Sequence, residues 1–221
     1  MFDSATVTSH PGHVHLTVPL PSGPLRLLQP DEAAELPDDG GVEWAPLVPY
    51  WAVLWRSGVA LAHELDGADL RGLRVVELGC GLGAPSIAAA RAGASVLATD
   101  EAPEALELVA RNAQLNDVQV ETARVRWSAP EELTARGPFD LVLAADVLYE
   151  RAAVAQLLAL LPRLAPRIWL ADPGRPAAEP FLEQARKRLH VTEKARRYLS
   201  GAPVFVWELC ADSAGPQSSS R

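Results

Sequence analysis

The residues best suited to bind a reactive ligand lie in the stretch VVELGCGLGAPS, residues 75–86. Gly79, Gly81 and Gly83 follow an apolar, strand-like segment and precede a helix-like one. Because glycine has no side chain, backbone N–H groups at such a turn can approach a ligand closely at the positive end of the helix. Asp100 lies near the spacing expected of an acidic residue that binds a ribose. The pattern predicts an adenosine cofactor, and the glycines alone fit NAD as well as any other.

Glu77 separates the candidate cofactors by charge. It lies two residues before Gly79, where its carboxylate would repel the pyrophosphate of a dinucleotide. S-adenosylmethionine has no phosphate and carries a sulfonium and an ammonium, so an acidic residue suits it. A short-chain dehydrogenase also needs a Tyr-x-x-x-Lys pair, whereas Tyr149 is followed at that spacing by Ala153. We therefore expect S-adenosylmethionine at this turn, with Cys80 as a small cofactor-side residue and not a nucleophile.

Alternating strand and helix patterns must position these residues. Strands are predicted at 75–79, 95–100, 119–127, 139–146 and 167–172, with helices up to about Gly93 and at 103–116, 152–164 and 179–189. Strands that alternate with helices predict an α/β fold with a Rossmann-like parallel sheet covered on both faces. The last two strand patterns, 191–199 and 203–209, have little helix between them and predict an antiparallel pair at one edge.

Composition limits the class of protein. At 221 residues and 48% hydrophobic content, the chain is long enough for one domain with a proper core. A net charge of −8 disfavours a nucleic-acid partner, and no apolar run reaches the roughly 18 to 20 residues that span a bilayer. Two cysteines and no signal-peptide pattern favour the cytoplasm. Only Lys187 and Lys194 are lysines among 20 basic residues, which indicates a GC-rich bacterial genome.

The ends of the chain differ in pattern from its centre. We predict an N-terminal extension at 1–41, a main domain at 42–210 and a disordered tail at 211–221. The alternating piece VHLTV, residues 14–18, fits an edge strand or a short hairpin. His10, His13 and His15 have no cysteine or acidic partner at ligand spacing, so we expect no metal site.

The glycine turn and its successor resemble a known family. ELGCGLG, followed by Thr99-Asp100, resembles the first motifs of the seven-strand S-adenosylmethionine-dependent methyltransferases, over about residues 50–209. The resemblance implies that the Gly79–Gly81 backbone faces the methionine moiety. It also implies that Asp100 accepts hydrogen bonds from both ribose hydroxyls, a role that suits the two oxygens of a carboxylate.

The stretch AADVLYE, residues 144–150, indicates the type of methyltransferase. Enzymes that act on planar amide or base nitrogens usually carry an Asn/Asp-Pro-Pro-aromatic motif here, and this chain has none. Asp146-Val-Leu-Tyr149 resembles the D-x-x-Y pattern of the lysine methyltransferases called methyltransferase family 16. PYWAVLWRSGVALA at 49–62 resembles that group as well, and DPGRP at 172–176 resembles its branch that modifies the electron transfer flavoprotein β-subunit.

The resemblance assigns roles to the D-x-x-Y residues. Asp146 would orient the substrate amine, or hold its ammonium for proton loss to water. Tyr149 would shape a narrow pocket, with its ring against the reacting cation. The structural alternative is that Asp146 caps the following helix and Tyr149 packs in the core.

The same resemblance adds residues around the cofactor. These are Trp55 beside the cofactor, Trp51 at the entrance, Trp127 against the adenine and the small residue Ala145. Either Trp51 or Trp55 could instead be a buried core residue. Arg126 stands where many relatives have an acidic residue that accepts from the adenine amino group, and arginine can only donate. A backbone carbonyl is then the expected acceptor. Arg56 replaces a proline that the family often has, without a physical reason evident in the sequence.

These observations predict an S-adenosylmethionine-dependent methyltransferase that acts on a lysine side chain of a protein substrate, such as the electron transfer flavoprotein β-subunit. Two alternatives stay open. The same fold could methylate a small-molecule amine, because the scaffold hosts many substrates. It could also be a binding module that has lost turnover, although the intact Asp146 and Tyr149 argue against this.

Overall fold

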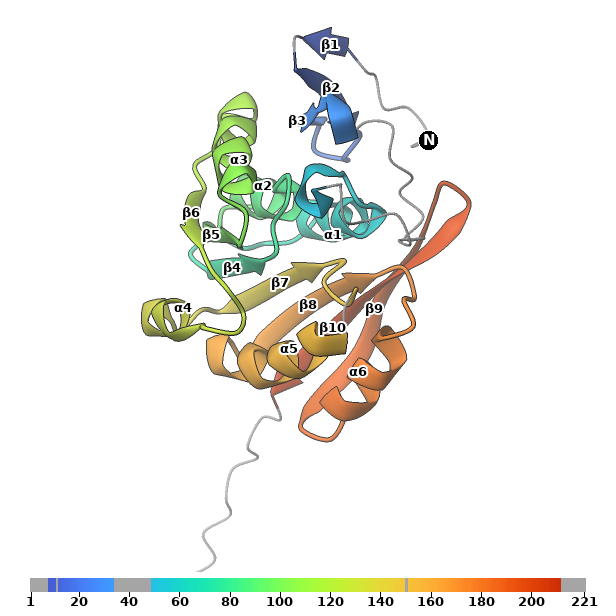
Figure 1. The fold of residues 1–221 in the computed structure, drawn as a ribbon. Coiled ribbons are helices and arrows are strands. Elements are labelled where there is room, and N and C mark those ends of the chain that lie inside the picture. The colour runs from blue at the N-terminus through green and yellow to red at the C-terminus, as the bar shows by residue number, and fades with distance from the viewer. Residues whose placement is uncertain (1–7, 11, 34–48, 150, 212–221) are drawn as a thin grey trace, which may run out of the picture.

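A computed structural model describes residues 8–10, 12–33, 49–149 and 151–211 (Figure 1). Within these residues the strands form a three-stranded sheet and a seven-stranded sheet. The larger sheet is built from β4 (Arg74–Leu78), β5 (Ser95–Asp100), β6 (Glu121–Arg124), β7 (Leu141–Ala145), β8 (Arg167–Asp172), β9 (Leu189–Leu199) and β10 (Ala202–Ala211). Its strand order is β6-β5-β4-β7-β8-β10-β9.

The pairing of these strands confirms the predicted fold class. β4, β5, β6, β7 and β8 run parallel to one another, whereas β10 is antiparallel to both β8 and β9. The predicted antiparallel pair therefore lies at one edge, with β10 inserted next to β8. The strand order reverses direction at β4, which has β5 on one side and β7 on the other. Ligands of open α/β sheets bind at such a reversal, beyond the carboxyl ends of the strands.

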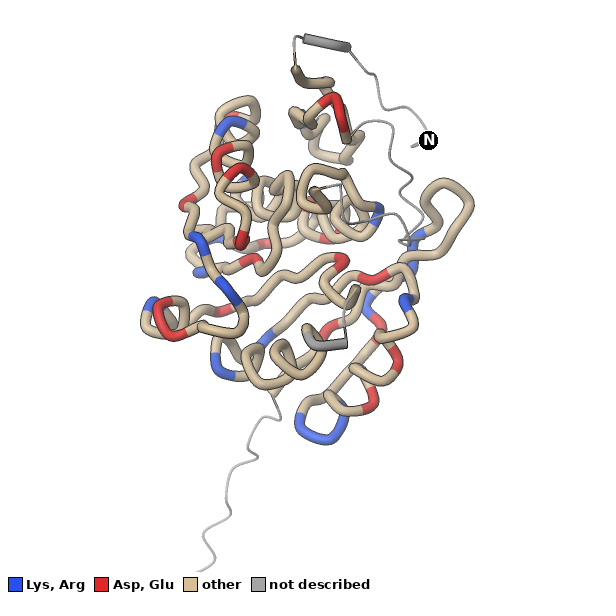
Figure 2. The backbone as a smooth tube through the Cα atoms, viewed as in Figure 1, with Lys and Arg blue, Asp and Glu red and all other residues tan. Residues whose placement is uncertain are grey.

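Helices cover both faces of the sheet. They are α1 (Arg56–Asp66), α2 (Ala84–Arg91), α3 (Pro103–Leu115), α4 (Glu131–Arg136), α5 (Arg151–Leu164) and α6 (Ala178–Ala185), with short 3₁₀ turns η1 (Asp31–Ala33) and η2 (Tyr50–Ala52). Figure 1 shows α1, α2 and α3 on one face and α4, α5 and α6 on the other. No helix in the described ranges is long and apolar enough to cross a membrane. In the view of Figure 2, basic and acidic residues are interspersed along these elements.

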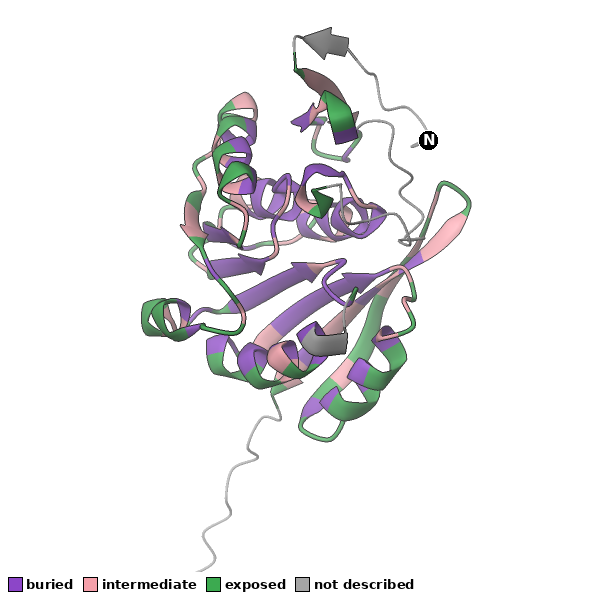
Figure 3. Cartoon of the chain, viewed as in Figure 1, coloured by how far each residue is buried: buried purple, intermediate pink, exposed green. Residues whose placement is uncertain are grey.

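Two hydrophobic cores hold the helices onto the sheet. Successive strand residues point to opposite faces, so Val75 joins the core beneath α1 and α2 while Val76 joins the core beneath α5 and α6. Leu143 and Val142 divide in the same way on β7. The central strands are therefore buried on both faces, as Figure 3 shows in purple, and their continuous apolar sequences follow from this.

The smaller sheet packs against α2 and α3 through its strand β3. It consists of β1 (Thr8–His10), β2 (His13–Val18) and β3 (Leu25–Pro30) in an antiparallel order. Leu25 and Leu27 of β3 are fully buried in the core that also contains α1 and α2. The VHLTV piece lies in β2. The predicted domain boundary near residue 41 and the predicted tail beyond residue 211 fall outside the described residues.

The third predicted strand is shorter than its sequence pattern. The pattern spans 119–127, but β6 covers only Glu121–Arg124. Among the described residues, β6 is an edge strand that pairs with β5 alone, and β5 ends at Asp100. Beyond the last shared bond, from the Val125 N–H to the Asp100 carbonyl, no strand in this part of the chain continues the ladder. Arg126 instead forms an isolated antiparallel bridge with Ala129.

Candidate active site

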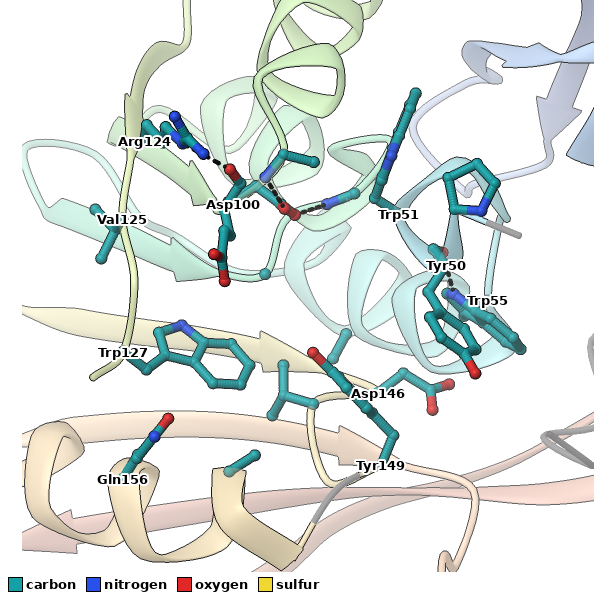
Figure 4. A pocket seen from close by; sticks show the side chains of 18 of the residues that line it. Tyr50, Trp51, Trp55, Asp100, Arg124, Val125, Trp127, Asp146, Tyr149 and Gln156 are labelled. Atoms are coloured by element: carbon teal, nitrogen blue, oxygen red, sulfur yellow. Dashed lines mark hydrogen bonds between the residues drawn. The ribbon is translucent and has the colours of Figure 1, made fainter. Parts of the chain in front are cut away.

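A cavity of about 740 Å³ opens at the carboxyl ends of β4, β5 and β7 (Figure 4). The cavity therefore lies where the strand order reverses, beside the glycine turn that the sequence predicted to bind the cofactor. Nine of the residues predicted for the site line this cavity. They are Trp51, Trp55, Gly79, Gly81, Asp100, Trp127, Ala145, Asp146 and Tyr149. Its volume lies in the range of about 300–1,000 Å³ that is usual for small-molecule sites.

Two glycines of the turn lie where a side chain would be unfavourable, both for the backbone conformation and for the space around it. Gly79 and Gly81 have φ angles of 65° and 49°, in the left-handed region that favours glycine. A Cβ on Gly81 would lie 3.0 Å from the backbone oxygen of Trp51. A Cβ on Gly79 would lie 3.3 Å from Cζ2 of Trp127. A side chain at either position would therefore press against a residue that lines the cavity, on a backbone that already favours glycine.

Asp100 is held at the end of β5 by the backbone around it. Its Oδ2 accepts the Gly81 N–H at 3.0 Å, and its Oδ1 accepts the Ala102 N–H at 3.0 Å (Figure 4). Burial raises the pKa of Asp100, and these N–H donors oppose that rise. Each carboxylate oxygen can accept a further hydrogen bond. The arrangement fits a ribose with two adjacent hydroxyls, and so fits the adenosyl group of S-adenosylmethionine.

Aromatic side chains form the walls of the cavity. Trp127 lies on the side nearest β6, and Trp51, Trp55 and Tyr50 lie on the side nearest α1 (Figure 4). The indole Nε1 of Trp55 donates to the Tyr50 carbonyl at 2.9 Å, which fixes this wall. Trp55 is only partly buried and lines the cavity, so the structure favours the cofactor-side role over a purely core one. Such walls suit the adenine and the apolar parts of the cofactor.

Asp146 and Tyr149 lie just beyond the end of β7. Asp146 has a φ of 60°, unusual for a residue other than glycine, and its N–H donates to the Ala171 carbonyl at 2.9 Å. Its side chain is buried and faces the cavity. Tyr149 is 49% exposed, so core packing does not explain it, and its ring stacks on Tyr50 with centroids 6.0 Å apart. Both side chains therefore line the cavity, and Tyr149 is also open to solvent.

Arg175 is a site residue that the sequence did not assign. Its Nε donates to Oδ1 of Asp146 at 2.6 Å, and its guanidinium lies 5.7 Å from the ring centroid of Trp55. The loop that carries it is fixed by Asp172, whose Oδ1 accepts the N–H groups of Gly174 and Arg175 at 2.7 Å each. The only signal in the sequence was the DPGRP stretch itself, which resembled a family branch without indicating a partner for the arginine.

Glu77 lies elsewhere than the sequence predicted. It is buried beneath α2, and its Oε2 accepts the Ser86 N–H at 2.9 Å and a hydrogen bond from the Ser86 hydroxyl. It does not line the cavity, and burial raises its pKa to about 8. The predicted contact of Glu77 with the cofactor is therefore wrong, and Glu77 instead supports the first turn of α2. The charge argument that the sequence drew from Glu77 therefore does not hold, and the fit of the site to S-adenosylmethionine rests on Asp100 and the glycine turn.

Cys80 and Gly83 also lie outside the cavity lining. Cys80 is buried against Ala98 and Val109, and burial raises the pKa of its thiol well above the usual value. Its side chain is therefore part of the packing behind the turn. Gly83 has a φ of 80°, and a Cβ there would lie 2.8 Å from Cγ2 of Val109. Both residues lie against Val109 of α3 and not at the cavity.

The two arginines that depart from the family pattern have partners of their own. Arg126 donates through Nε to Oε1 of Glu101 at 2.8 Å, on the exposed rim of the site. Arg56 is buried at the start of α1 and lies with Nη1 3.4 Å from the Leu199 carbonyl at the tip of the β9–β10 hairpin. Neither side chain lines the cavity, so neither blocks the adenine or the reacting groups.

The chain matches a family model described as lysine methyltransferase, over residues 51–169, more than half of its 221 residues. The chain belongs to this lysine methyltransferase family. Membership confirms the predicted family, methyltransferase family 16, and its cofactor, S-adenosylmethionine. The matched range contains the glycine turn, Asp100, Asp146 and Tyr149, whereas Arg175 lies just beyond it.

Curated members of this lysine methyltransferase family are similar over part of their length. The chain is 38% identical over 120 residues to the protein N-lysine methyltransferase METTL21A of Danio rerio, covering 51% of this chain and 55% of that protein. It is 40% identical over 137 residues to the electron transfer flavoprotein beta subunit lysine methyltransferase of Xenopus laevis, covering 58% and 53% respectively. The chain thus spans about half the length of the curated relatives it matches.

Solved structures share the fold at low sequence identity. The magnesium protoporphyrin IX methyltransferase of Synechocystis PCC 6803 with bound SAM has a TM-score of 0.57 and 21% identity, covering 70% of this chain and 77% of that one. A TehB-like SAM-dependent methyltransferase from Corynebacterium glutamicum has a TM-score of 0.55 and 19% identity, covering 68% and 86%. These similarities concern the fold alone.

Proposed function

We propose that this protein transfers the methyl group of S-adenosylmethionine to a lysine side chain of a protein substrate. One observation carries the proposal. The Gly79–Gly81 turn and Asp100, which suit the cofactor, line the same cavity as Asp146 and Tyr149, which suit an amine. Both relatives named above are lysine methyltransferases, which supports the choice of acceptor.

The arrangement supports an in-line transfer in which position supplies most of the catalysis. Bound S-adenosylmethionine supplies a methyl group activated by its sulfonium. Asp100 and the glycine turn hold the adenosine and methionine ends in one orientation. Asp146 accepts an N–H of the incoming amine and directs its lone pair into the cavity. Tyr149 and Tyr50 form an aromatic wall that suits the aliphatic stem and the cationic product.

We also propose the target class and the setting. The electron transfer flavoprotein β-subunit is the leading candidate substrate, because a relative named for that target is 40% identical over 137 residues. The acidic net charge of −8 suits a basic substrate surface. A cytoplasmic location and a bacterial origin, which the composition favours, belong to the same proposal.

Label mapping tests this function. The protein is incubated with methyl-labelled S-adenosylmethionine and a lysate of its host, and labelled residues are located by mass spectrometry. We expect label on lysine in one or a few proteins. Label found only in small metabolites would support a small-molecule amine methyltransferase instead. Tight cofactor binding without turnover on lysate, peptides and free amines would indicate a binding module.

A pair of variants on one strand serves as the matched control. Asp146 follows β7 at the cavity, whereas Asp140 precedes β7 at the opposite end, where Oδ2 accepts the Arg74 N–H at 2.7 Å. Asp146→Asn should lower turnover by about 10²-fold or more, the usual range for a group that positions a proton transfer. Asp140→Asn should leave turnover unchanged. Equal effects of the two substitutions would contradict the role of Asp146.

A further inference from the structure

Asp146 and Arg175 form an ion pair that is nearly shielded from solvent. Nε of Arg175 donates to Oδ1 of Asp146 at 2.6 Å, and Nη2 contacts the same oxygen. The side chain of Arg175 is 10% exposed and that of Asp146 is 5% exposed. Water screens a pair this buried only weakly, so the two charges act strongly on each other.

Several contacts hold the pair in place. Asp172 fixes the loop by accepting the N–H groups of Gly174 and Arg175 at 2.7 Å each. The guanidinium of Arg175 lies over the ring of Trp55, 5.7 Å from its centroid. Asp146 keeps its side chain on the cavity side through a left-handed backbone with φ of 60°. The pair is therefore a fixed part of the cavity wall.

An unpaired carboxylate at this position would conflict with the proposed chemistry. A lysine attacks only after its ammonium has lost a proton, and a nearby negative charge favours the ammonium and raises its pKa. The amine nevertheless needs an acceptor that orients it. A carboxylate whose charge is balanced by a guanidinium satisfies both needs, because it still accepts a hydrogen bond but adds little net negative charge.

We propose that Arg175 is a positioning residue that balances the charge of Asp146, so that Asp146 orients the substrate amine without stabilising its protonated form. This inference rests on the proposed function. The substrate ammonium first releases a proton to water. The nitrogen lone pair then forms the new N–C bond while the C–S bond breaks and its electron pair stays on sulfur. The methylated ammonium carries the positive charge away from the site.

Other titratable groups face the same space. Besides the pair, those that line the cavity within the described ranges are Tyr50, Asp100, Glu101, Arg124 and Tyr149. Asp172 lies behind the pair, and burial raises its pKa to about 6, with the charge of Asp146 adding to the rise. Glu150 lies outside the described residues. All of these groups remain in an Arg175 variant, so a difference between its pH profile and that of the wild type reports on the charge at Arg175.

The pH dependence of turnover tests the inference. Rates are measured with the electron transfer flavoprotein β-subunit and saturating S-adenosylmethionine, from about pH 6.5 to about pH 10, which brackets the ordinary lysine pKa. In Arg175→Gln we expect the rising limb of kcat to move up by about one pH unit, an about tenfold loss near neutral pH that high pH restores. KM for the protein substrate should not rise. Arg175→Lys restores the charge and should move the limb back.

Control variants separate charge from structure. Arg186→Gln removes an exposed guanidinium that pairs with Glu179, at 2.9 Å, and should leave the profile unchanged. Should Arg175→Gln fail to fold, Arg175→Met tests the same shift, because it keeps an aliphatic stem against Trp55.

Two negative results have different meanings. A loss of kcat that is uniform across the pH range, without a shifted limb and without rescue by Arg175→Lys, overturns the inference and leaves the proposed function standing. A wild-type protein that methylates no protein lysine overturns the proposed function, and this inference with it.

Discussion

The side chain of Asn112 on α3 pairs with the backbone of Leu28 on β3. Its Oδ1 accepts the Leu28 N–H at 2.7 Å, and its Nδ2 lies 3.3 Å from the Leu28 carbonyl and 3.0 Å from the Leu82 carbonyl. One helical turn later, Asn116 pairs with the backbone of Arg26 in the same way. The side-chain amides of Asn112 and Asn116 thus form hydrogen bonds with backbone N–H and C=O groups along the outer edge of β3, where a neighbouring strand would otherwise bind.

We expect this pairing to stabilise the attachment of the N-terminal sheet. Asn112 is fully buried, so Asn112→Ala leaves buried backbone groups of Leu28 and Leu82 without partners. The free energy of unfolding should fall by about 2–4 kcal/mol, since each such group costs about 1–3 kcal/mol. Urea unfolding measures the loss, and hydrogen exchange at Leu28 locates it. Asn116→Ala, at a more exposed position where water can replace the amide, should cost less than about 1 kcal/mol. Equal losses would contradict the argument.

The buried carboxyl of Glu77 predicts a pH-dependent stability. Burial raises its pKa from 4.5 to about 8 in the folded protein. Between these values the unfolded chain ionises Glu77 and the folded one does not, so ionisation favours unfolding. Its stabilising contribution is therefore complete below about pH 4.5 and is lost as the pH rises to about 8, at up to about 1.4 kcal/mol per pH unit.

Thermal melts of Glu77→Gln measure this contribution. Glutamine keeps an acceptor for the Ser86 N–H but cannot ionise. The Tm of the variant should exceed that of the wild type increasingly from pH 5 to pH 8, and the two should converge at lower pH. Glu104→Gln, at an exposed position on α3, should show no such divergence. Parallel Tm curves for Glu77→Gln and wild type would rule the linkage out.

Asp100 should decide cofactor affinity. Asp100→Asn places an amide nitrogen opposite a backbone N–H of Gly81 or Ala102, and it removes one acceptor for the ribose. We expect S-adenosylhomocysteine to bind at least about tenfold more weakly, which corresponds to about 1.4 kcal/mol. Isothermal titration calorimetry measures this. Asp117→Asn, an exposed change beyond the end of α3, should bind normally. If Asp100→Asn bound S-adenosylhomocysteine with full affinity, that result would contradict the placement of the cofactor beside Asp100.

Gly81 should tolerate no side chain. Gly81→Ala puts a Cβ 3.0 Å from the Trp51 carbonyl oxygen and imposes a φ of 49° on alanine. We expect a loss of about 1–2 kcal/mol in stability from the backbone alone, together with weaker binding of S-adenosylhomocysteine. Gly67→Ala is the matched control, because its φ is −95° and its Cβ would meet nothing within 4 Å. If Gly81→Ala kept the stability and the cofactor affinity of the wild type, the backbone at Trp51 would have to move aside at little cost.

The sheet was predictable from the sequence because its signals are local. β5 and β8 have the bounds that their apolar runs predicted, 95–100 and 167–172. Buried parallel strands need continuous apolar residues, and the intervening helices need apolar residues at helical spacing, so each element carries its own pattern. β6 was overestimated because a strand also needs a neighbour, and β5 ends at Asp100. Residues 125–127 keep a strand-like pattern, and nothing in that pattern shows where β5 ends.

The site was predictable where its residues form short motifs. Gly79, Gly81, Asp146 and Tyr149 belong to contiguous stretches, and all four line one cavity. Glu77 was misplaced because it lies within β4, where its side chain points to the same face as Val75, beneath α2, and not to the cavity at the end of the strand.

By itself, the sequence determined the order of strands and helices, the glycine turn at the end of a strand, and the Asp-x-x-Tyr pair at the end of another. Each of these depends on neighbours a few residues away. Only the tertiary structure decided that Arg175 balances Asp146 across 29 residues, and that Asn112 completes β3 across 84 residues. Polar groups that are buried take whichever partner the packed elements bring within reach, and that choice has no local pattern.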